Sequence, residues 1–271
     1  MIKIDGISVG NYENIINGDC PSFSGIVAGE SKGNLWVDNI ERPKIAITDS
    51  YAVGSFAFLG SINSEDEYMR LKNYIRNDIF NFLKQKGKDC FEYSVESDDL
   101  KPYIQKMFED KIIQSEKEYS FRITESNNKN HSLPEGFKMQ IVDFDLWGKV
   151  IDGDFKNELL LTKRLLESWE SFDKFEKKGV GFCITYLDSI VAVIIGTARF
   201  NNIISIDIEI VDELKHKGLG YSLTIEFVNE CMQRGIIPQW DCVESNPISR
   251  KLAEKAGFKL FKENEVFWFE I

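Results

Sequence analysis

The sequence has few of the residues that metal sites and disulfide frameworks require. Its 271 residues include only two histidines, His131 and His216. There are five cysteines and no CxxC pair, and the cysteines lie at Cys20, Cys90, Cys183, Cys231 and Cys242. An odd number at wide spacing is typical of reduced thiols in a cytosol. We therefore expect no disulfide framework, no zinc or other metal site, and core roles for most of these thiols.

Long apolar runs are also missing. No stretch approaches the roughly 18 apolar residues that a membrane-spanning helix needs. The first residues, MIKIDGISVGNYENII, lack the apolar segment of a secretory signal. The sequence therefore predicts a protein without membrane spans, located in the cytoplasm.

Positive charge is scarce as well. The chain has 33 Lys and Arg against 44 Asp and Glu, a formal net charge of −11. Nucleic-acid binding needs clustered basic residues, so we expect no nucleic-acid partner. An acidic surface favours a cationic substrate, but it also serves solubility alone, and the sequence leaves both readings open.

The chain is long enough for two domains of ordinary size. A polar, asparagine-rich stretch, TESNNKNHSLP at 124–134, has the composition of a linker. We expect an N-terminal α/β domain at 1–123, a linker at 124–132 and a second domain at 133–271.

The second half reads as alternating strands and helices of an α/β (α+β) fold. We expect strands at 136–143, 181–187, 190–200, 202–211 and 237–244, with the turn Asp188-Ser189 between the second and third, and a final strand pair within 258–271. We expect one long helix at 157–179, one running from Gly218 to Arg234 and Gly235, and one at 246–257. This order predicts a mixed sheet flanked by helices.

The two halves resemble each other at a fixed offset. Segments 95–123 and 243–271 align without a gap, and each begins with Val-Glu-Ser. The preceding helices end at Gly87 and Gly235, at the same offset. The shared order favours a divergent repeat over coincidence. The helix of the first half begins with NSEDEYMRL, whose acidic residues cap a helix but do not receive a phosphate.

A charged glycine loop, KHKGLG at 215–220, lies between a strand and a helix of the second half. Amides at a helix N-terminus and two residues without side chains favour a bound anion. Taken alone, the loop is better explained as a solvated turn that uses glycine for its backbone angles.

With its surroundings, this region resembles the GCN5-related N-acetyltransferase (GNAT) superfamily. The first family signature, Gln/Arg-x-x-Gly-x-Gly/Ala, matches 215–220 with Lys215 in the Gln/Arg position. The second, an asparagine-headed helix running into Gly-Phe, matches NPISRKLAEKAGF. The resemblance covers 133–271. It implies a GNAT fold there, an extra N-terminal domain as in a bacterial subgroup, and an N-terminal half that is a degenerate GNAT-like repeat.

The resemblance implies acetyl-CoA as cofactor and a set of residues that bind it. Its pyrophosphate would lie on the loop and first helical turn, at Lys215, His216, Lys217, Gly218, Leu219, Gly220, Tyr221 and Ser222. Its pantetheine arm would pair with the strand end at Ile210, Val211 and Asp212, where an amide could also polarise the thioester carbonyl. Asn246 and Ser249 would contact the cofactor from the second helix, although Asn246 is equally explained as a helix cap.

Three acidic residues are candidates for handling an acceptor amine. Asp207 and Glu209 are two apart on one strand and so share a face. Glu209 is the expected catalytic base, with a structural or substrate-charge role as the alternative, and Asp207 is the weaker candidate. Asp241 could bind a cationic acceptor or simply end its strand. Many relatives have a tyrosine general acid where this chain has Ala253, so we assign no general acid.

The resemblance implies an enzyme, an acyltransferase that moves an acetyl group directly to an amine of a small molecule or peptide in a ternary complex. One alternative is a non-catalytic acyl-CoA-binding or scaffold protein, which the missing tyrosine favours and Glu209 opposes. Another is an aminoacyl-tRNA-dependent transferase, which the phosphate loop and the acidic charge oppose. An acyl-cysteine mechanism is disfavoured by the apolar surroundings of the cysteines. The sequence leaves open whether the protein forms a homodimer.

Overall fold

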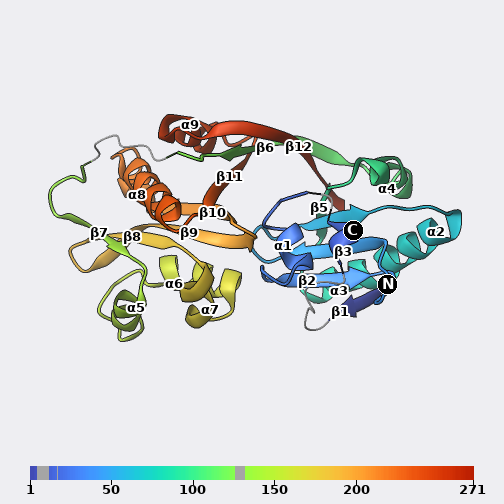
Figure 1. Cartoon of the computed structure of the whole chain (residues 1–271), viewed down its shortest axis with the longest axis horizontal. Helices are drawn as coiled ribbons and strands as arrows, with labels where there is room; N and C mark the ends of the chain where they lie inside the picture. The colour runs from blue at the N-terminus through green and yellow to red at the C-terminus, as the bar shows by residue number, and fades with distance from the viewer. Residues whose placement is uncertain (5–11, 17, 126–131) are drawn as a thin grey trace. The chain divides into compact units, whose positions relative to one another are not determined.

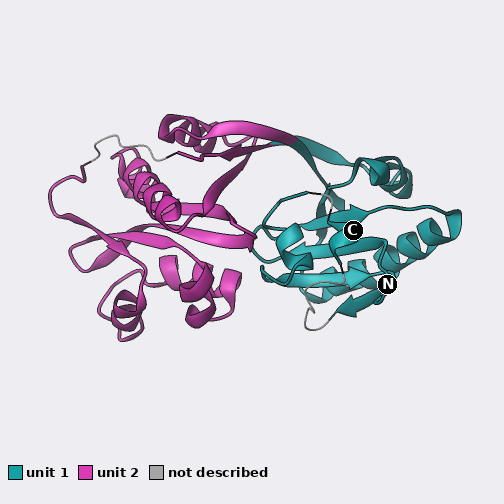
Figure 2. Cartoon of the chain, in the orientation of Figure 1, with its two compact units in different colours: residues 1–118, 264–271 teal, residues 119–263 magenta. Residues whose placement is uncertain are grey.

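The computed structural model describes residues 1–4, 12–16, 18–125 and 132–271. The chain forms two compact units (Figure 2). The first unit consists of residues Met1–Glu118 and Asn264–Ile271, and the second of Tyr119–Glu263. No helix within the described ranges is long and apolar enough to cross a membrane.

The first unit is built on a mixed sheet (Figure 1). Its strands, in spatial order, are β1 (Ile2–Ile4), β2 (Gly33–Val37), β3 (Ile45–Ser50), β4 (Phe56–Gly60), β5 (Cys90–Val95) and the end of β12 (Lys259–Glu270). Neighbours are antiparallel except β4 and β5, which are parallel. Its helical segments are η1 (Glu13–Ile15), α1 (Ser24–Val27), α2 (Glu65–Tyr74), η2 (Ile75–Ile79), α3 (Phe80–Gln85), η3 (Asp98–Leu100) and α4 (Lys101–Met107).

Aromatic side chains fill the core of the first unit. Phe91 lies at the centre, with ring centroids 5.1 Å from Phe56, 5.3 Å from Tyr93 and 5.6 Å from Phe269. Phe269 comes from the last strand and is 2% exposed. The last strand of the chain is therefore part of the first unit's core.

The strands of the second unit also form both parallel and antiparallel pairs. Its strands, in spatial order, are β6 (Gln114–Arg122), β11 (Ile237–Val243), β10 (Ile203–Ile210), β9 (Ser189–Phe200), β8 (Gly181–Tyr186) and β7 (Phe137–Ile141). The pair β10 and β11 is parallel. The pairs β7–β8, β8–β9 and β9–β10 are antiparallel. Its helical segments are α5 (Phe144–Ile151), α6 (Leu159–Trp169), α7 (Phe172–Lys178), η4 (Asp212–Leu214), α8 (Leu219–Gln233) and α9 (Pro247–Ala256).

Helices cover both faces of the second unit's sheet (Figure 1). The helices α5, α6 and α7 pack on one face, where Leu165 and Trp169 meet Val193 and Ile195. The helix α8 packs on the other face against Ile204 and its neighbours. A second cluster on that face joins α8 and α9 to β11 and to the end of β6. The expected α/β class with a mixed, helix-flanked sheet is confirmed.

Four expected boundaries are wrong. The helix expected at 157–179 is broken at Glu170, whose φ is +65°, and Ser171 starts α7 by accepting a hydrogen bond from the Lys174 amide. Residues Phe144–Ile151, for which no helix or strand was expected, form α5, capped by Asp143. The turn between β8 and β9 is Leu187-Asp188, and the final strand pair is one strand, β12.

The expected internal repeat has a structural counterpart. The starts of β2 and β8, Gly33 and Gly181, are 148 residues apart, and so are the starts of α1 and α7, Ser24 and Phe172. In both units two antiparallel strand pairs lead into one parallel pair. The last strand of each half is exchanged: β6 ends in the second unit, and β12 ends in the first.

This exchange separates the compact units from the expected domains. The predicted second domain, 133–271, includes the eight final residues that pack with the first unit. Most of the predicted linker falls on 126–131, outside the described residues. The expected domain boundaries, 1–123 and 133–271, therefore stay a prediction.

Candidate active site

The loop before α8 presents a row of amides without acceptors. Within the described part of the chain, the backbone N–H groups of residues 216–221 donate no hydrogen bond. The next amide, that of Ser222, is the first to be satisfied, by the Gly218 carbonyl at 3.1 Å. These six donors lie at the N-terminus of a 15-residue helix, whose dipole adds positive potential. The arrangement favours an anion.

Backbone angles in this loop explain its sequence. His216 has φ +66° and Gly218 has φ +83°, and both values lie in the region that favours glycine. A side chain at Gly218 would meet no atom within 4 Å, so this part of the loop is open. A Cβ at Gly220 would lie 3.1 Å from Ile210 and 3.2 Å from Leu252. Gly220 therefore allows α8 to approach β10 and α9 closely.

The charged residues of the loop are exposed, and one of them is already paired. Lys215 contacts the Asp212 carboxylate at 2.5 Å. This contact lowers the pKa of Asp212 and raises that of Lys215. His216 and Lys217 are exposed beside it. The side chain of Asp212 therefore has a local role, which was not expected from the sequence.

The strands β10 and β11 part in front of this loop (Figure 1). They pair only over Ile203–Ser205 and Ile237–Gln239, although β10 continues to Ile210. Beyond the fork, β10 stays paired with β9, and the Val211 amide donates to the Val191 carbonyl at 3.0 Å. Backbone groups alternate along a strand, so the amides of Ile208 and Ile210 point into the fork.

A bulge next to the fork is fixed by a buried indole. The register of β9 against β10 shifts between Ser205 and Ile206. On β9 at that point, the Gly196 carbonyl accepts a hydrogen bond of 2.7 Å from Trp169 of α6. A Cβ at Gly196 would lie 2.1 Å from the end of the Ile204 side chain, so a larger residue there would require Ile204 to move.

The two carboxylates on β10 differ in their surroundings. Both lie on the α6 face, because their partners on β9, Ile195 and Val193, pack against that helix. Asp207 forms an ion pair with Arg164 of α6 at 2.5 Å. Glu209 is exposed and forms no side-chain hydrogen bond within the described residues. Lys215 is close enough that the charge of Glu209 helps to raise the pKa of the Lys215 ammonium.

Across the fork, β11 presents a polar chain on the same face. Arg122 of β6 donates two hydrogen bonds to the Gln239 side-chain oxygen, at 3.0 and 2.7 Å. The Gln239 amide then donates to both carboxylate oxygens of Asp241, at 3.0 and 3.1 Å. Gln239 is 1% exposed. Sequence reasoning missed Arg122, Gln239 and Arg164. Arg122 is 117 positions from Gln239, and Arg164 is 43 positions from Asp207, so no local pattern connects either pair.

The start of α9 is held by hydrogen bonds of its own. The Asn246 side chain accepts from the Ser249 amide at 3.1 Å and so caps the helix. The Ser249 hydroxyl accepts from Trp240 of β11 at 2.8 Å. Ala253 is fully buried. The structure thus shows the capping role of Asn246, while cofactor contacts of Asn246 and Ser249 stay predictions.

The first turn of α8 joins these parts. Leu219 and Ser222 are buried, and Tyr221 is half-buried with the Lys255 ammonium 4.7 Å from its ring centroid. Tyr221 also packs against the cluster formed by α8, α9 and β11. The first turn of α8 therefore packs against the second half of α9, while the capped head of α9 is bonded to β11.

The buried thiols are poor nucleophiles. Burial raises the pKa of Cys183 to about 12, and it also raises that of Cys231 to about 12. A thiol is nucleophilic only as its thiolate. Among the described residues, no group of three or more His, Cys, Asp or Glu is arranged to hold a metal.

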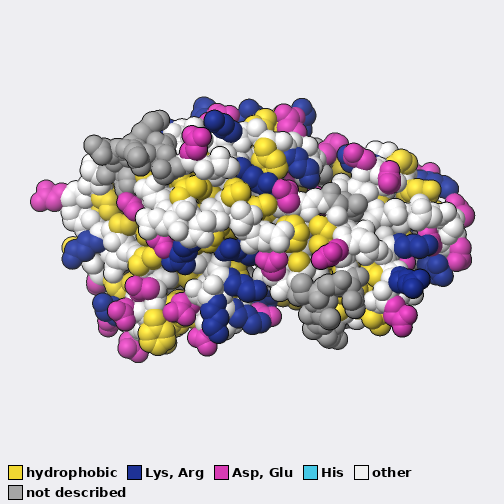
Figure 3. All heavy atoms as spheres, viewed as in Figure 1, with side chains coloured by type: hydrophobic (Ala, Val, Ile, Leu, Met, Phe, Trp, Pro, Cys, Tyr) yellow, Lys and Arg dark blue, Asp and Glu magenta, His cyan; other side chains and the backbone are white. Residues whose placement is uncertain are grey.

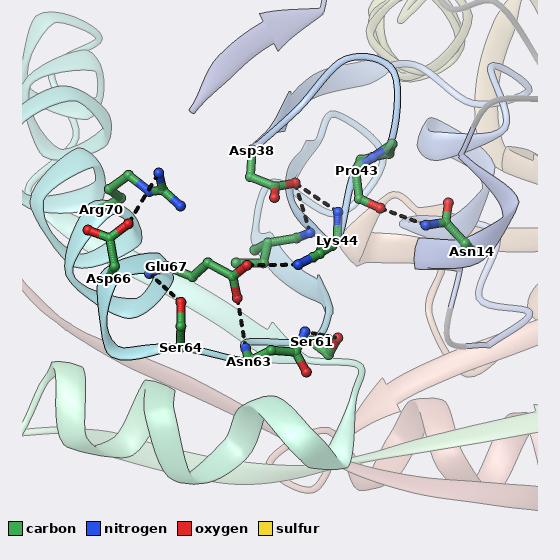
Figure 4. Close-up of polar contacts among 11 residues, drawn as sticks. Asn14, Asp38, Pro43, Lys44, Ser61, Asn63, Ser64, Asp66, Glu67 and Arg70 are labelled. Carbon is green, nitrogen blue, oxygen red and sulfur yellow. Dashed lines mark hydrogen bonds and ion pairs between the residues drawn. The ribbon is translucent and has the colours of Figure 1, made fainter.

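The corresponding helix start in the first unit is closed by its own carboxylate (Figure 4). The Glu67 side chain accepts from the Asn63 amide at 2.8 Å and from Lys44 at 3.0 Å. Ser64 caps the same helix by accepting from the Glu67 amide at 3.2 Å. The strands β4 and β5 pair up to Phe58 and Val95, near the ends of both. Among its described residues, the first unit has no such fork, and its helix start has a shorter run of amides without acceptors, at residues 64–66.

A family comparison agrees with this geometry. The model of the GNAT acetyltransferase family matches residues 15–267. The chain belongs to the GNAT acetyltransferase family. It is accordingly an acyltransferase. The match also spans the first unit, which the sequence resemblance did not cover.

A curated relative and several solved structures are similar to this GNAT protein. The uncharacterized N-acetyltransferase YdfB of Bacillus subtilis is 23% identical over 250 residues, covering 92% of this chain and 90% of its own. A GCN5-related N-acetyltransferase-like protein from Streptococcus suis superposes with a TM-score of 0.63 at 19% identity, covering 94% of this chain and 96% of its own.

A tandem GNAT protein from the clavulanic acid biosynthesis pathway is also similar. It superposes with a TM-score of 0.56 at 9% identity, covering 89% of this chain and 83% of its own. At such identities the structural likeness establishes the fold alone. Together with the family match, it confirms the expected GNAT fold.

Proposed function

We propose that this GNAT protein transfers an acetyl group from acetyl-CoA to an amine of a small molecule or peptide. The observation that carries the proposal is the row of six open amides at residues 216–221. A pyrophosphate supplies several anionic oxygens, which amides at a helix N-terminus can bind. Lys215, His216 and Lys217 lie beside it and add positive charge.

The fork supports the path of the pantetheine arm. An extended amide chain can pair with the backbone of β10, as a neighbouring strand would, where β11 no longer does. The amides of Ile208 and Ile210 face that gap, and the half-buried Ile210 and Val211 line it. An amide at this point would also stabilise charge on the thioester oxygen.

Glu209 is the proposed base. It is two residues before Val211 on the strand that would hold the thioester, and it has no side-chain partner among the described residues. An acceptor amine is largely protonated near neutral pH, so it must lose a proton before it attacks. The Asp207 carboxylate is already bound by Arg164, whereas that of Glu209 is open to an acceptor.

A second candidate function is acyl-CoA binding without turnover. It is favoured by Ala253, which places a buried methyl group where many relatives have a tyrosine. A transferase that depends on aminoacyl-tRNA is less well supported, because acidic and basic side chains are interspersed on the face shown in Figure 3. The cytoplasmic location and the homodimer stay predictions.

Release of coenzyme A thiol separates these functions. The purified protein is incubated with acetyl-CoA and a set of primary amines, and free thiol is measured against a sample without amine. An acetyltransferase releases thiol in proportion to an acetylated amine identified by mass spectrometry. Tight binding of acetyl-CoA without amine-dependent release supports the binding protein instead.

A further inference from the structure

We propose that the acceptor binds as a single ammonium on the α6 face of the fork, between Asp207 and Asp241 and above Ser205. This inference rests on the proposed function and specifies its substrate class as a primary amine with one positive charge.

The register of the parting strands brings these residues together. Ser205 and Gln239 are the last residues that β10 and β11 pair. One step further on the same face, β10 presents Asp207 and β11 presents Asp241. The two carboxylates therefore stand on opposite arms of the fork, next to the point where the strands separate.

A buried hydroxyl at the base of the fork has no partner. Ser205 is 4% exposed, and its hydroxyl forms no hydrogen bond in the structure. Leaving a buried hydroxyl unsatisfied costs about 1–3 kcal/mol. Ser205 shares a strand face with Asp207, so its hydroxyl lies on the side where the carboxylates stand. An ammonium has three donors and would satisfy this hydroxyl together with the two carboxylates.

The charges around the fork indicate how many positive charges the acceptor has. Arg164 balances Asp207 directly, and Arg122 is connected to Asp241 through Gln239. Glu209 is the third carboxylate on this face, with no ion pair among the described residues. Lys215, which is near Glu209, is already neutralised by Asp212, so these three acidic and two basic side chains leave one negative charge. One ammonium compensates this charge, and two would exceed it.

The transfer step is then balanced within the site. The bound ammonium gives one proton to the Glu209 carboxylate and becomes a neutral amine. Its nitrogen attacks the thioester carbon, the C–N bond forms, and the C–S bond breaks. The coenzyme A thiolate leaves and takes up the second proton from the nitrogen. The products are the thiol and the neutral N-acetyl compound, and Glu209 returns the first proton to solvent.

Three amines of equal chain length test the proposal that the acceptor has one positive charge. Butylamine, 1,4-diaminobutane and 4-aminobutanoate have the same amine on four carbons, but they differ in net charge. Thiol release from acetyl-CoA should give butylamine the highest kcat/KM, by about tenfold or more over the other two. A higher value for the diamine or the amino acid overturns the proposal. So does the absence of turnover with all three when acetyl-CoA binds.

Two variants test the residues. Ser205→Ala and Asp241→Asn should each raise KM for butylamine about tenfold or more and leave the Kd for acetyl-CoA unchanged. Asp188→Asn, in the β8–β9 turn of the same unit, is the matched control and should change neither. Circular dichroism melting verifies that each variant is folded.

Unchanged KM values in folded Ser205→Ala and Asp241→Asn would overturn the acceptor site while acetyl-CoA binding stands. If the wild-type protein does not bind acetyl-CoA, the proposed function is overturned, and this inference with it.

Discussion

At the scale of single residues, two carboxylates on one strand have different environments. Asp207 forms an ion pair with the Arg164 guanidinium, which restrains its position. Glu209, two residues on, is exposed and has no ion pair among the described residues. The strand pattern alone identified both residues as sharing a face. Only the contact with Arg164 distinguishes them.

Replacing Glu209 with glutamine should reduce turnover and not cofactor binding. General-base catalysis typically contributes about 10²–10⁴-fold in rate, so kcat for Glu209→Gln should fall within that range. Stopped thiol-release assays measure kcat, and calorimetry measures the Kd for acetyl-CoA. Glu213→Gln, exposed in η4, is the control. An unchanged kcat would remove Glu209 from the mechanism.

The buried thiols should be inert in the folded protein. Because burial raises the pKa of Cys183 and Cys231 to about 12, neither forms thiolate at pH 8. A chromogenic disulfide reagent should therefore label them only after denaturation, as mapped by peptide mass spectrometry. Rapid labelling of either residue in folded protein would contradict this account and revive a cysteine nucleophile.

At the scale of elements, two helix starts show how one fold is open or closed to anions. The start of α8 has six amides without acceptors among the described residues. The start of α2 is closed by Glu67, Ser64 and the ion pair with Lys44. The first unit supplies its own anion where the second leaves room for a ligand.

The charge of Glu67 should stabilise the first unit in a pH-dependent way. The Asn63 amide and then Lys44 lower the pKa of Glu67 in the folded state. Its contribution is therefore fully present above the unfolded pKa of about 4.3, and it is lost as pH falls through the folded value. Glu67→Gln should cost up to about 1 kcal/mol near neutrality.

Thermal melts of the wild type and Glu67→Gln test this prediction. They should cover roughly pH 3 to 7, because a glutamate carboxyl loses its proton within that range. The difference in Tm should shrink toward the acid end. Asp66→Asn, whose side chain is 79% exposed beside Arg70, is the control and should show a smaller effect. A difference that grows as pH falls would contradict the assigned sign.

The sequence predicted the sheet, the glycine loop before α8 and the heads of α8 and α9, because glycine, asparagine and proline mark these points locally. It missed the break at Glu170, where no glycine or proline stands and the cap of Ser171 decides the boundary. It missed α5, although Asp143 three residues before Leu146 is a capping signal. Contacts such as Arg122 with Gln239 depend on tertiary pairing, which local patterns do not contain.

At the scale of the whole molecule, each unit is completed by a strand from the other half of the sequence. The second unit takes the end of β6, with Tyr119 and Phe121 in its core. The first unit takes the end of β12, with Phe269 packed 4.8 Å from Phe108 between ring centroids. A boundary drawn in the sequence at one linker cannot describe such an exchange.

Truncating Phe269 should therefore loosen the first unit. Phe269→Ala removes a buried ring, at a cost of about 3–5 kcal/mol. Hydrogen exchange should speed up in β5, which pairs with this part of β12, and stay unchanged in β9. Leu260→Ala, 42% exposed on the same strand, is the control. Protection of β5 that survives Phe269→Ala would contradict the assignment.

The central claim is that the amides of residues 216–221 bind the pyrophosphate of acetyl-CoA. The most direct measurement is calorimetric titration of acetyl-CoA into the wild type and into Gly218→Asp. Aspartate tolerates a positive φ better than most residues, and as a helix cap it would supply the carboxylate that Glu67 supplies in the first unit. Gly218→Ala controls for backbone strain alone.

The account predicts that the wild type binds, and that Gly218→Asp binds at least about tenfold more weakly than Gly218→Ala, while both variants stay folded. Equal affinity of Gly218→Asp and Gly218→Ala, or a wild type that gives no binding heat, would contradict it.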